Sequence, residues 1–138
     1  MGERELYDYA VVSEDWNEAP KTLAEAADGE SILRRERLYR ATDDGFGHDD
    51  DQIGVLFLEE RRSLEPAEIV CRAVFRFSDE DSLTASGTLA EKSTDGGASV
   101  DNGRLGVVGG SGRFARARGQ VHVQVENPKR WFAEDPFG

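Results

Sequence analysis

The chain has 138 residues, of which 38% are hydrophobic and 33% charged, and its formal net charge is −11. This length suits one domain with one core, and the composition is that of a folded protein rather than a disordered one. The acidic excess excludes nucleic acid as a partner, because binding a phosphate backbone needs a cationic footprint. No run of about 18 apolar residues is present, so the sequence predicts no transmembrane helix and no membrane partner.

The negative charge lies in the first part of the chain. Positions 1–60 hold 17 acidic and 6 basic residues, whereas positions 61–138 hold 11 of each. The simplest consequence is solubility, with a cationic partner or substrate as the alternative. No basic segment followed by an apolar one opens the sequence, and its one cysteine, Cys71, cannot form an internal disulfide. We therefore expect a cytoplasmic protein.

The first third of the chain predicts two strands joined by a long connection. Residues 5–12 alternate and are rich in Tyr and Val, as in a strand. Residues 13–30 are acidic and predict a connection or flap with at most one or two helical turns. The periodicity of residues 31–41 fits a helix or a strand, and the neighbouring segments favour a strand. Residues 42–52 are full of Asp and Gly and predict a turn.

The rest of the chain predicts further short strands and turns. In residues 67–77, Ile69, Cys71 and Phe75 share one face, and a tight turn leads into a hairpin partner. Seven or eight antiparallel strands at this spacing favour a sandwich or a barrel within a single domain, residues 1–138. The later strands are expected at 53–62, 67–77, 82–92, 104–110 and 119–127, with a loop at 93–103 and a tail at 128–138.

Residues 110–115 read Gly-Ser-Gly-Arg-Phe-Ala, the spelling of a dinucleotide-binding turn. Such a turn must open a helix and lead to a second parallel strand. After Ala115, however, Val121, Val123 and Val125 alternate with polar residues at period two. The stretch therefore predicts a tight corner in an all-β protein.

Four glycines give the backbone of this corner its conformational freedom. We expect Gly109, Gly110 and Gly112 to allow positive φ angles, and Gly119 to restart the strand. Phe114 and Ala115 are expected to close the end of a barrel where the corner folds inward.

The stretch "VVGGSGRFARARG" resembles the "GGTGxFxxARG" signature of the dirigent and allene oxide cyclase barrels. The upstream pieces "CRAVFRFSDEDSLTASGTL" and "QIGVLFLEE" are similar to strands of the same family. The resemblance covers about residues 30–126, with Ser111 in place of the usual threonine. It implies a closed antiparallel eight-stranded β-barrel with a lipocalin-like cavity that forms homodimers or homotrimers.

The resemblance also implies a function. Bacterial relatives include cyclases of polyketide pathways, among them enzymes of [4+2] cycloaddition. We therefore expect a cofactor-independent cyclase or isomerase of specialised metabolism that folds a small hydrophobic substrate inside the barrel lumen. One alternative is a non-catalytic, dirigent-like or lipocalin-like binder of a small hydrophobic molecule. Another is a structural oligomer whose lumen is packed shut.

Catalytic candidates are polar side chains on otherwise apolar strands. Tyr9 and Tyr39 could donate hydrogen bonds from the wall of the lumen, although surface or interface positions fit them as well. Glu36 and Arg37 face opposite sides of one strand, and we expect Arg37 to point inward because it shares its face with Tyr39. A surface charge is the alternative for Arg37.

Aromatic residues and the cysteine are the expected substrate contacts. Cys71 is expected to be a small buried side chain rather than a nucleophile, because no spacing suggests its activation. The aspartates next to His48 suggest a metal site, but their spacing lacks the alternating ligands of a calcium-binding loop. We therefore expect no bound metal, and the proposed reaction requires no cofactor. The expected substrate-binding residues are Phe57, Cys71, Phe75, Trp16 and Trp131, the two tryptophans at the mouth of the barrel.

Overall fold

The computed structural model describes residues 11–15, 23–42, 47–94, 97–125 and 129–134. Strands make up most of this part of the chain, and only two short 3-10 helices accompany them. The elements are β1 (Val11–Asp15), η1 (Leu23–Glu25), β2 (Ser31–Ala41), β3 (His48–Leu64), β4 (Ala67–Arg76), β5 (Ser82–Thr94), β6 (Gly97–Val100), β7 (Gly103–Ser111), η2 (Gly112–Phe114), β8 (Gln120–Gln124) and β9 (Lys129–Glu134).

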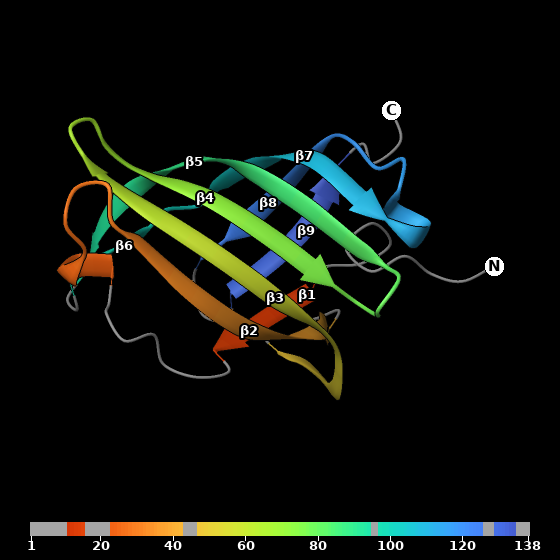
Figure 1. Cartoon of the computed structure of the whole chain (residues 1–138). Coiled ribbons are helices and arrows are strands. Elements are labelled where there is room, and N and C mark those ends of the chain that lie inside the picture. Colours follow the sequence, from red (N-terminus) through yellow and green to blue (C-terminus); the bar gives the residue numbers. More distant parts are fainter. Residues whose placement is uncertain (1–10, 16–22, 43–46, 95–96, 126–128, 135–138) are drawn as a thin grey trace.

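The strands form a closed barrel. Their order in the sheet is β4-β3-β2-β1-β9-β8-β7-β5-β6, and an additional pairing joins β4 to β5. That pairing closes the circuit through eight strands, while β6 pairs with the far end of β5 (Figure 1). Every pairing is antiparallel. The prediction of an all-β, closed, antiparallel eight-stranded barrel is thus confirmed.

Several strands lie where the sequence places them. The segment 31–41, ambiguous by periodicity, is β2. The hairpin of residues 67–77 and 82–92 is β4 and β5, with Arg76 opposite Ser82 next to the turn. The tract after Ala115 is extended as β8, as its period of two predicts.

Four boundaries differ from the prediction. Residues 13–15, expected in the connection, belong to β1. Residues 48–52, expected in a turn, begin β3, and the expected loop at 93–103 contains β6. The expected tail at 128–138 contains β9, which pairs with β1 and closes the barrel. The partner of β9, β1, comes from a distant part of the chain, which local sequence signals do not reveal. The start of β3 and β6 instead pair with the strands that precede them in the sequence, β2 and β5, although their polar and glycine-rich composition is typical of turns. Of the strand expected at 5–12, only its last two residues lie within the described part of the chain.

Alternation of buried and exposed residues separates the interior from the outer face along β4, whereas on β1 the consecutive residues Val11 and Val12 are both buried. On β4, Cys71 and Phe75 are buried whereas Arg72 between them is exposed. Burying a large apolar side chain contributes about 1.5–3 kcal/mol. The largest fully buried side chains are Trp131, Phe75, Phe114, Leu38, Leu56, Ile69, Leu83, Leu105, Val11, Val12 and Val121.

The two 3-10 helices lie at opposite ends of the barrel (Figure 1). At one end η1 packs against β6, and the guanidinium of Arg62 donates to the carbonyl oxygens of Leu23 and Ala26 at 3.3 and 3.1 Å. At the other end, Phe114 of η2 is fully buried and contacts the ring of Phe77. Each end of the barrel thus carries an element anchored by contacts to the wall.

The glycine corner differs in detail from the prediction. Gly112 and Gly119 have φ angles of 60° and 95°, the left-handed region that glycine favours. Gly109 and Gly110 have no positive φ and belong to β7, so that expectation is wrong for these two. Ala115 is exposed, and Phe114 alone of the expected pair is buried. The corner turns at Gly112 rather than earlier because β7 continues to Ser111.

Candidate functional site

Two carboxylates lie inside the barrel. Glu36 of β2 and Glu60 of β3 are each only 3% exposed. They share their faces with Leu38 and Leu58, respectively, which belong to the hydrophobic core. Acidic side chains are almost never this buried unless a charged partner or hydrogen bonds compensate the lost hydration. The interior of this barrel therefore contains a polar region within an apolar wall.

A cation lies beside each carboxylate. The Nε atom of Arg34 is 2.8 Å from Oε1 of Glu60, and the Nζ atom of Lys129 is 3.5 Å from Oε2 of Glu36. The carboxylate side chains are 4% exposed, whereas those of Arg34 and Lys129 are 26% and 19% exposed. Solvent thus reaches the cationic side of each pair. We call Arg34, Glu36, Glu60 and Lys129 the interior charged cluster.

Cys71 belongs to the same electrostatic environment. It lies directly opposite Glu60 in the β3–β4 pairing. Burial, and to a lesser extent the charge of Glu60, raises the pKa of the Cys71 thiol to about 12, while Lys129 acts in the opposite direction. At neutral pH this group is a neutral thiol. Since the thiolate is the nucleophile, Cys71 serves as a small buried wall residue.

Aromatic rings line the interior next to the charged cluster. The rings of Phe75 and Trp131 meet edge to face with 5.2 Å between centroids. The indole N–H of Trp131 donates to Oγ of Ser13 at 2.8 Å, and Nζ of Lys129 lies 5.3 Å from the Trp131 ring centroid. Such a cation–π contact stabilises an ammonium that has left bulk water. An apolar molecule bound here would contact flat aromatic surface and charged groups at once.

The structure places some predicted catalytic residues on the outer face. Arg37 alternates with the buried Glu36 and Leu38, so the expectation that Arg37 points inward is wrong. Tyr39 stacks on the ring of His48, with 4.3 Å between centroids, and His48 contacts the exposed carboxylate of Glu14. This group lies outside the barrel, away from the core cluster. Tyr9 lies outside the described residues.

Some of the predicted substrate-binding residues also lie in the interior of the barrel and others on its outer face. Cys71, Phe75 and Trp131 face the interior, where all three are buried. Trp131 lies in the core rather than at the mouth of the barrel, so that part of the expectation is wrong. Phe57 is 39% exposed and lies on the outer face of β3, which corrects its expected place in the lumen. Trp16 lies outside the described residues.

Sequence reasoning missed the interior charged cluster, although one signal was present. Glu36 continues the alternation of Ile32 and Leu38, and Glu60 continues that of Leu56 and Leu58. A carboxylate in step with buried aliphatic residues indicates an interior acid. Lys129 could not be found this way, because it follows Pro128 in a segment without alternation.

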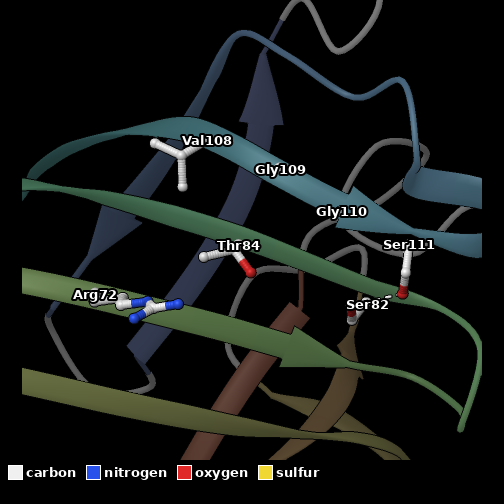
Figure 2. A pocket seen from close by; sticks show the side chains of 7 residues that line it. All are labelled: Arg72, Ser82, Thr84, Val108, Gly109, Gly110 and Ser111. Atoms are coloured by element: carbon white, nitrogen blue, oxygen red, sulfur yellow. Dashed lines mark hydrogen bonds between the residues drawn. The ribbon is translucent and has the colours of Figure 1, made fainter.

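A hollow lies on the outside of the barrel. It has a volume of about 310 Å³ and lies over β4, β5 and β7 (Figure 2). The residues that line it are Arg72, Ser82, Thr84, Val108, Gly109, Gly110 and Ser111.

Within the described ranges, no three His, Cys, Asp or Glu side chains gather in a way that could hold a metal ion.

Comparison with known proteins shows the fold alone. No family model matches the chain, and no curated protein matches its sequence. A solved structure described as pyocyanin demethylase has a similar fold, with a TM-score of 0.63 over 88% of this chain and 93% of that chain. The two sequences are 12% identical. No comparison tests the family resemblance at residues 107–119, which stays a resemblance. The similarity to pyocyanin demethylase concerns the fold of the barrel.

Among the residues that the structure describes, no helix has the length and apolar character that crossing a bilayer requires.

Proposed function

We propose that the protein is a cyclase or isomerase that acts on a small hydrophobic carbonyl compound of polyketide type inside the barrel. The observation that carries the proposal is the pair of carboxylates, Glu36 and Glu60, buried in the interior with cations beside them. Buried ion pairs contribute little net stability, because desolvation offsets most of the attraction between the charges. Charged groups retained at this position support a role in chemistry.

Glu36 and Lys129 have complementary roles in this proposal. The carboxylate of Glu36 removes a proton from the carbon next to the substrate carbonyl. The ammonium of Lys129 donates a hydrogen bond to the carbonyl oxygen, which becomes an enolate oxygen. The separation of 3.5 Å between these two groups is long for a hydrogen-bonded ion pair, which supports exchange of partners when a substrate binds.

The reaction then needs no second reactant. In an isomerisation, the proton held by Glu36 returns to another carbon of the same molecule. In a ring closure, the enolate carbon forms a bond to an electrophilic carbon within the substrate, and the proton is delivered to the carbon that gains the electron pair. Holding a flexible chain in its reactive shape can lower the barrier by about 7–11 kcal/mol in favourable cases. A carbonyl polarised by Lys129 would also favour a [4+2] closure.

Glu60 and Arg34 position this machinery. Their contact of 2.8 Å is shorter than that of Glu36 with Lys129, which suits a fixed pair rather than a proton carrier. Cys71, Phe75 and Trp131 supply the apolar surface against which the substrate folds. The similarity to pyocyanin demethylase supports the proposal only in that a protein named as an enzyme has this fold.

The test uses a synthetic linear 1,3-diketone that carries an internal enone, whose ring closure by conjugate addition is an isomerisation. Purified protein is incubated with this compound, and the cyclic product is measured by chromatography against a protein-free control. We expect ring closure faster than in the control and a change in tryptophan fluorescence. Binding without faster closure would contradict the catalytic proposal and favour a binding protein. Absence of both effects would overturn an interior site altogether.

A further inference from the structure

The hollow on the outer face originates in an irregularity of the β5–β7 pairing. Thr84 pairs with Gly109 and Ala85 with Val107, so Val108 is an extra residue in β7. Such a bulge changes which side of the sheet the following residues face. Val108 is 64% exposed, and Gly109, opposite the outward-facing Thr84, lies on the same outer face. Two consecutive residues of β7 thus face outward, and the second has no side chain.

Gly109 forms the open part of the hollow. A Cβ atom placed on Gly109 would meet nothing within 4 Å, and this residue has no positive φ. By contrast, a Cβ atom on the neighbouring Gly110 would collide with the backbone of Phe114 and Ser82. The space above Gly109 is therefore unoccupied by protein, whereas that beside Gly110 is filled.

Arg72 is the charged group of this hollow. Its partner across the β3–β4 pairing is Glu59, yet no ion pair joins the two side chains. Within the described part of the chain, no hydrogen bond or ion pair of the Arg72 guanidinium is found. Figure 2 shows the Arg72 side chain extended along its own strand, β4, with Thr84 on the neighbouring strand.

Hydroxyl groups complete the lining. Thr84 stands on the strand next to Arg72 (Figure 2). The hydroxyls of Ser82 and Ser111 are 2.8 Å apart, and Ser111 donates to the carbonyl oxygen of Glu80 at 2.8 Å. Ser111 therefore has its proton engaged and its position fixed. The hollow combines a cation and hydroxyl groups at one side with the apolar side chain of Val108 at the other.

We propose that this hollow is a second binding site, on the outside of the barrel, for a small molecule that carries an oxyanion on an apolar body. The planar guanidinium of Arg72 matches the two oxygens of a phosphate or carboxylate group. Thr84 donates a further hydrogen bond, and the apolar body lies on Val108 above Gly109. This site shares no residues with the interior charged cluster. Failure of the proposed reaction would therefore not contradict ligand binding at this site.

The test uses phenyl phosphate as the probe and measures amide shifts of the ¹⁵N-labelled protein during titration. We expect saturable shifts at Thr84, Val108 and Gly109. Inorganic phosphate should bind more weakly at the same residues, because it lacks the body that contacts Val108. Shifts that do not saturate, or that lie mainly at interior residues such as Phe75, would overturn the proposal.

Two variants with matched controls sharpen the test. Arg72→Gln should weaken phenyl phosphate about tenfold or more, since it removes a charge-assisted hydrogen-bond donor. Arg104→Gln, which removes one exposed charge from β7 outside the hollow, should change the affinity less than about twofold. If both variants lost the same affinity for phenyl phosphate, the effect would come from the overall charge of the protein, and the proposed site would be wrong.

The second pair tests the shape of the hollow. Gly109→Val places a side chain in the open space and should abolish saturable binding, with amide shifts elsewhere unchanged. Gly106→Ala lies earlier on β7, outside the hollow, where a Cβ atom makes ordinary contacts, and should leave binding unchanged. Undiminished binding by a folded Gly109→Val protein would overturn the proposal.

Discussion

Trp131 donates its indole N–H to the hydroxyl oxygen of Ser13 inside the barrel, and this bond joins the last strand to the first. The pairing of β1 with β9 has three residue pairs in its register, so side-chain contacts at this seam matter for closure. Both residues are buried. The seam is therefore where the integrity of the barrel is most directly tested.

Trp131→Phe should lower the free energy of unfolding by about 2–4 kcal/mol, because it removes core volume and leaves the Ser13 hydroxyl unpaired by the indole. Chemical denaturation monitored by circular dichroism measures the change. Phe132→Leu, on the opposite face of β9 where Phe132 stacks on His122, is the control and should change stability by less than about 1 kcal/mol. Equal effects of the two substitutions would contradict the inward placement of Trp131.

Gly109→Ala and Gly110→Ala should have opposite outcomes although the two residues are adjacent. Gly109 has open space at its Cβ position, so alanine should leave stability unchanged or slightly raised. At Gly110 the added methyl meets the carbonyl oxygen of Ser82 at 2.9 Å and the backbone of Phe114, so stability should fall by about 1–3 kcal/mol. Thermal unfolding of both variants measures this difference. Similar melting temperatures would contradict the bulge geometry of β7.

Alkylation should be slow at Cys71 in the folded protein. Burial raises its pKa to about 12, so the reactive thiolate is scarce at pH 8. Iodoacetamide should modify Cys71 at a rate that increases sharply only when denaturant unfolds the chain, as measured by mass spectrometry. Rapid modification of the native protein at pH 8 would show that the thiol is activated and would reverse its assignment as a wall residue.

The stability of the protein should depend on pH through His48. Its Nδ1 lies 2.6 Å from the carbonyl oxygen of Asp49 and its Nε2 lies 2.7 Å from the carboxylate of Glu14, so the cation satisfies both contacts. The Asp49 carbonyl has the largest effect and raises the pKa of His48 above its ordinary value of 6.5; burial opposes it, and the charges of Glu14 and Asp50 raise the pKa further. The resulting stabilisation is complete below 6.5 and is lost as the pH rises through the folded-state pKa.

His48→Gln should remove this pH dependence. Because the Glu14 side chain is largely exposed, screening limits the amplitude to about 0.2–1 kcal/mol. Unfolding of the native protein and the variant is compared between pH 5.5 and 8.5. An identical pH profile for both proteins would contradict the two-sided contact of His48.

The sequence was sufficient for the strands whose apolar residues alternate. Val121 and Val123 identified β8 and excluded a nucleotide-binding helix, and Cys71 with Phe75 gave the inner face of β4. For β2 the predicted inner face is wrong, because charged residues occur on both faces of this strand. The aliphatic residues Ile32 and Leu38, which lie on the same face as Glu36, indicate the inner face of β2 correctly. The face shared by Arg37 and Tyr39 does not.

The candidate site was less predictable than the fold. The interior charged cluster joins β2, β3 and β9, and the contact of Glu36 with Lys129 spans 93 positions in the sequence. Barrel closure brings these two residues together, and nothing in either segment alone specifies their proximity. Likewise, the bulge at Val108 depends on the register of β5 against β7 and leaves no local signal beyond the glycines that follow it.

The central claim is that the buried carboxylate of Glu36 transfers a proton during ring closure. The measurement is kcat/KM for the linear diketone with the native protein, with Glu36→Gln, and with Glu59→Gln as a control on the outer face of β3. Thermal unfolding of each protein verifies that it is folded. We predict that Glu36→Gln lowers kcat/KM by about 100-fold or more while Glu59→Gln leaves it unchanged. A folded Glu36→Gln protein with native kcat/KM would contradict the account.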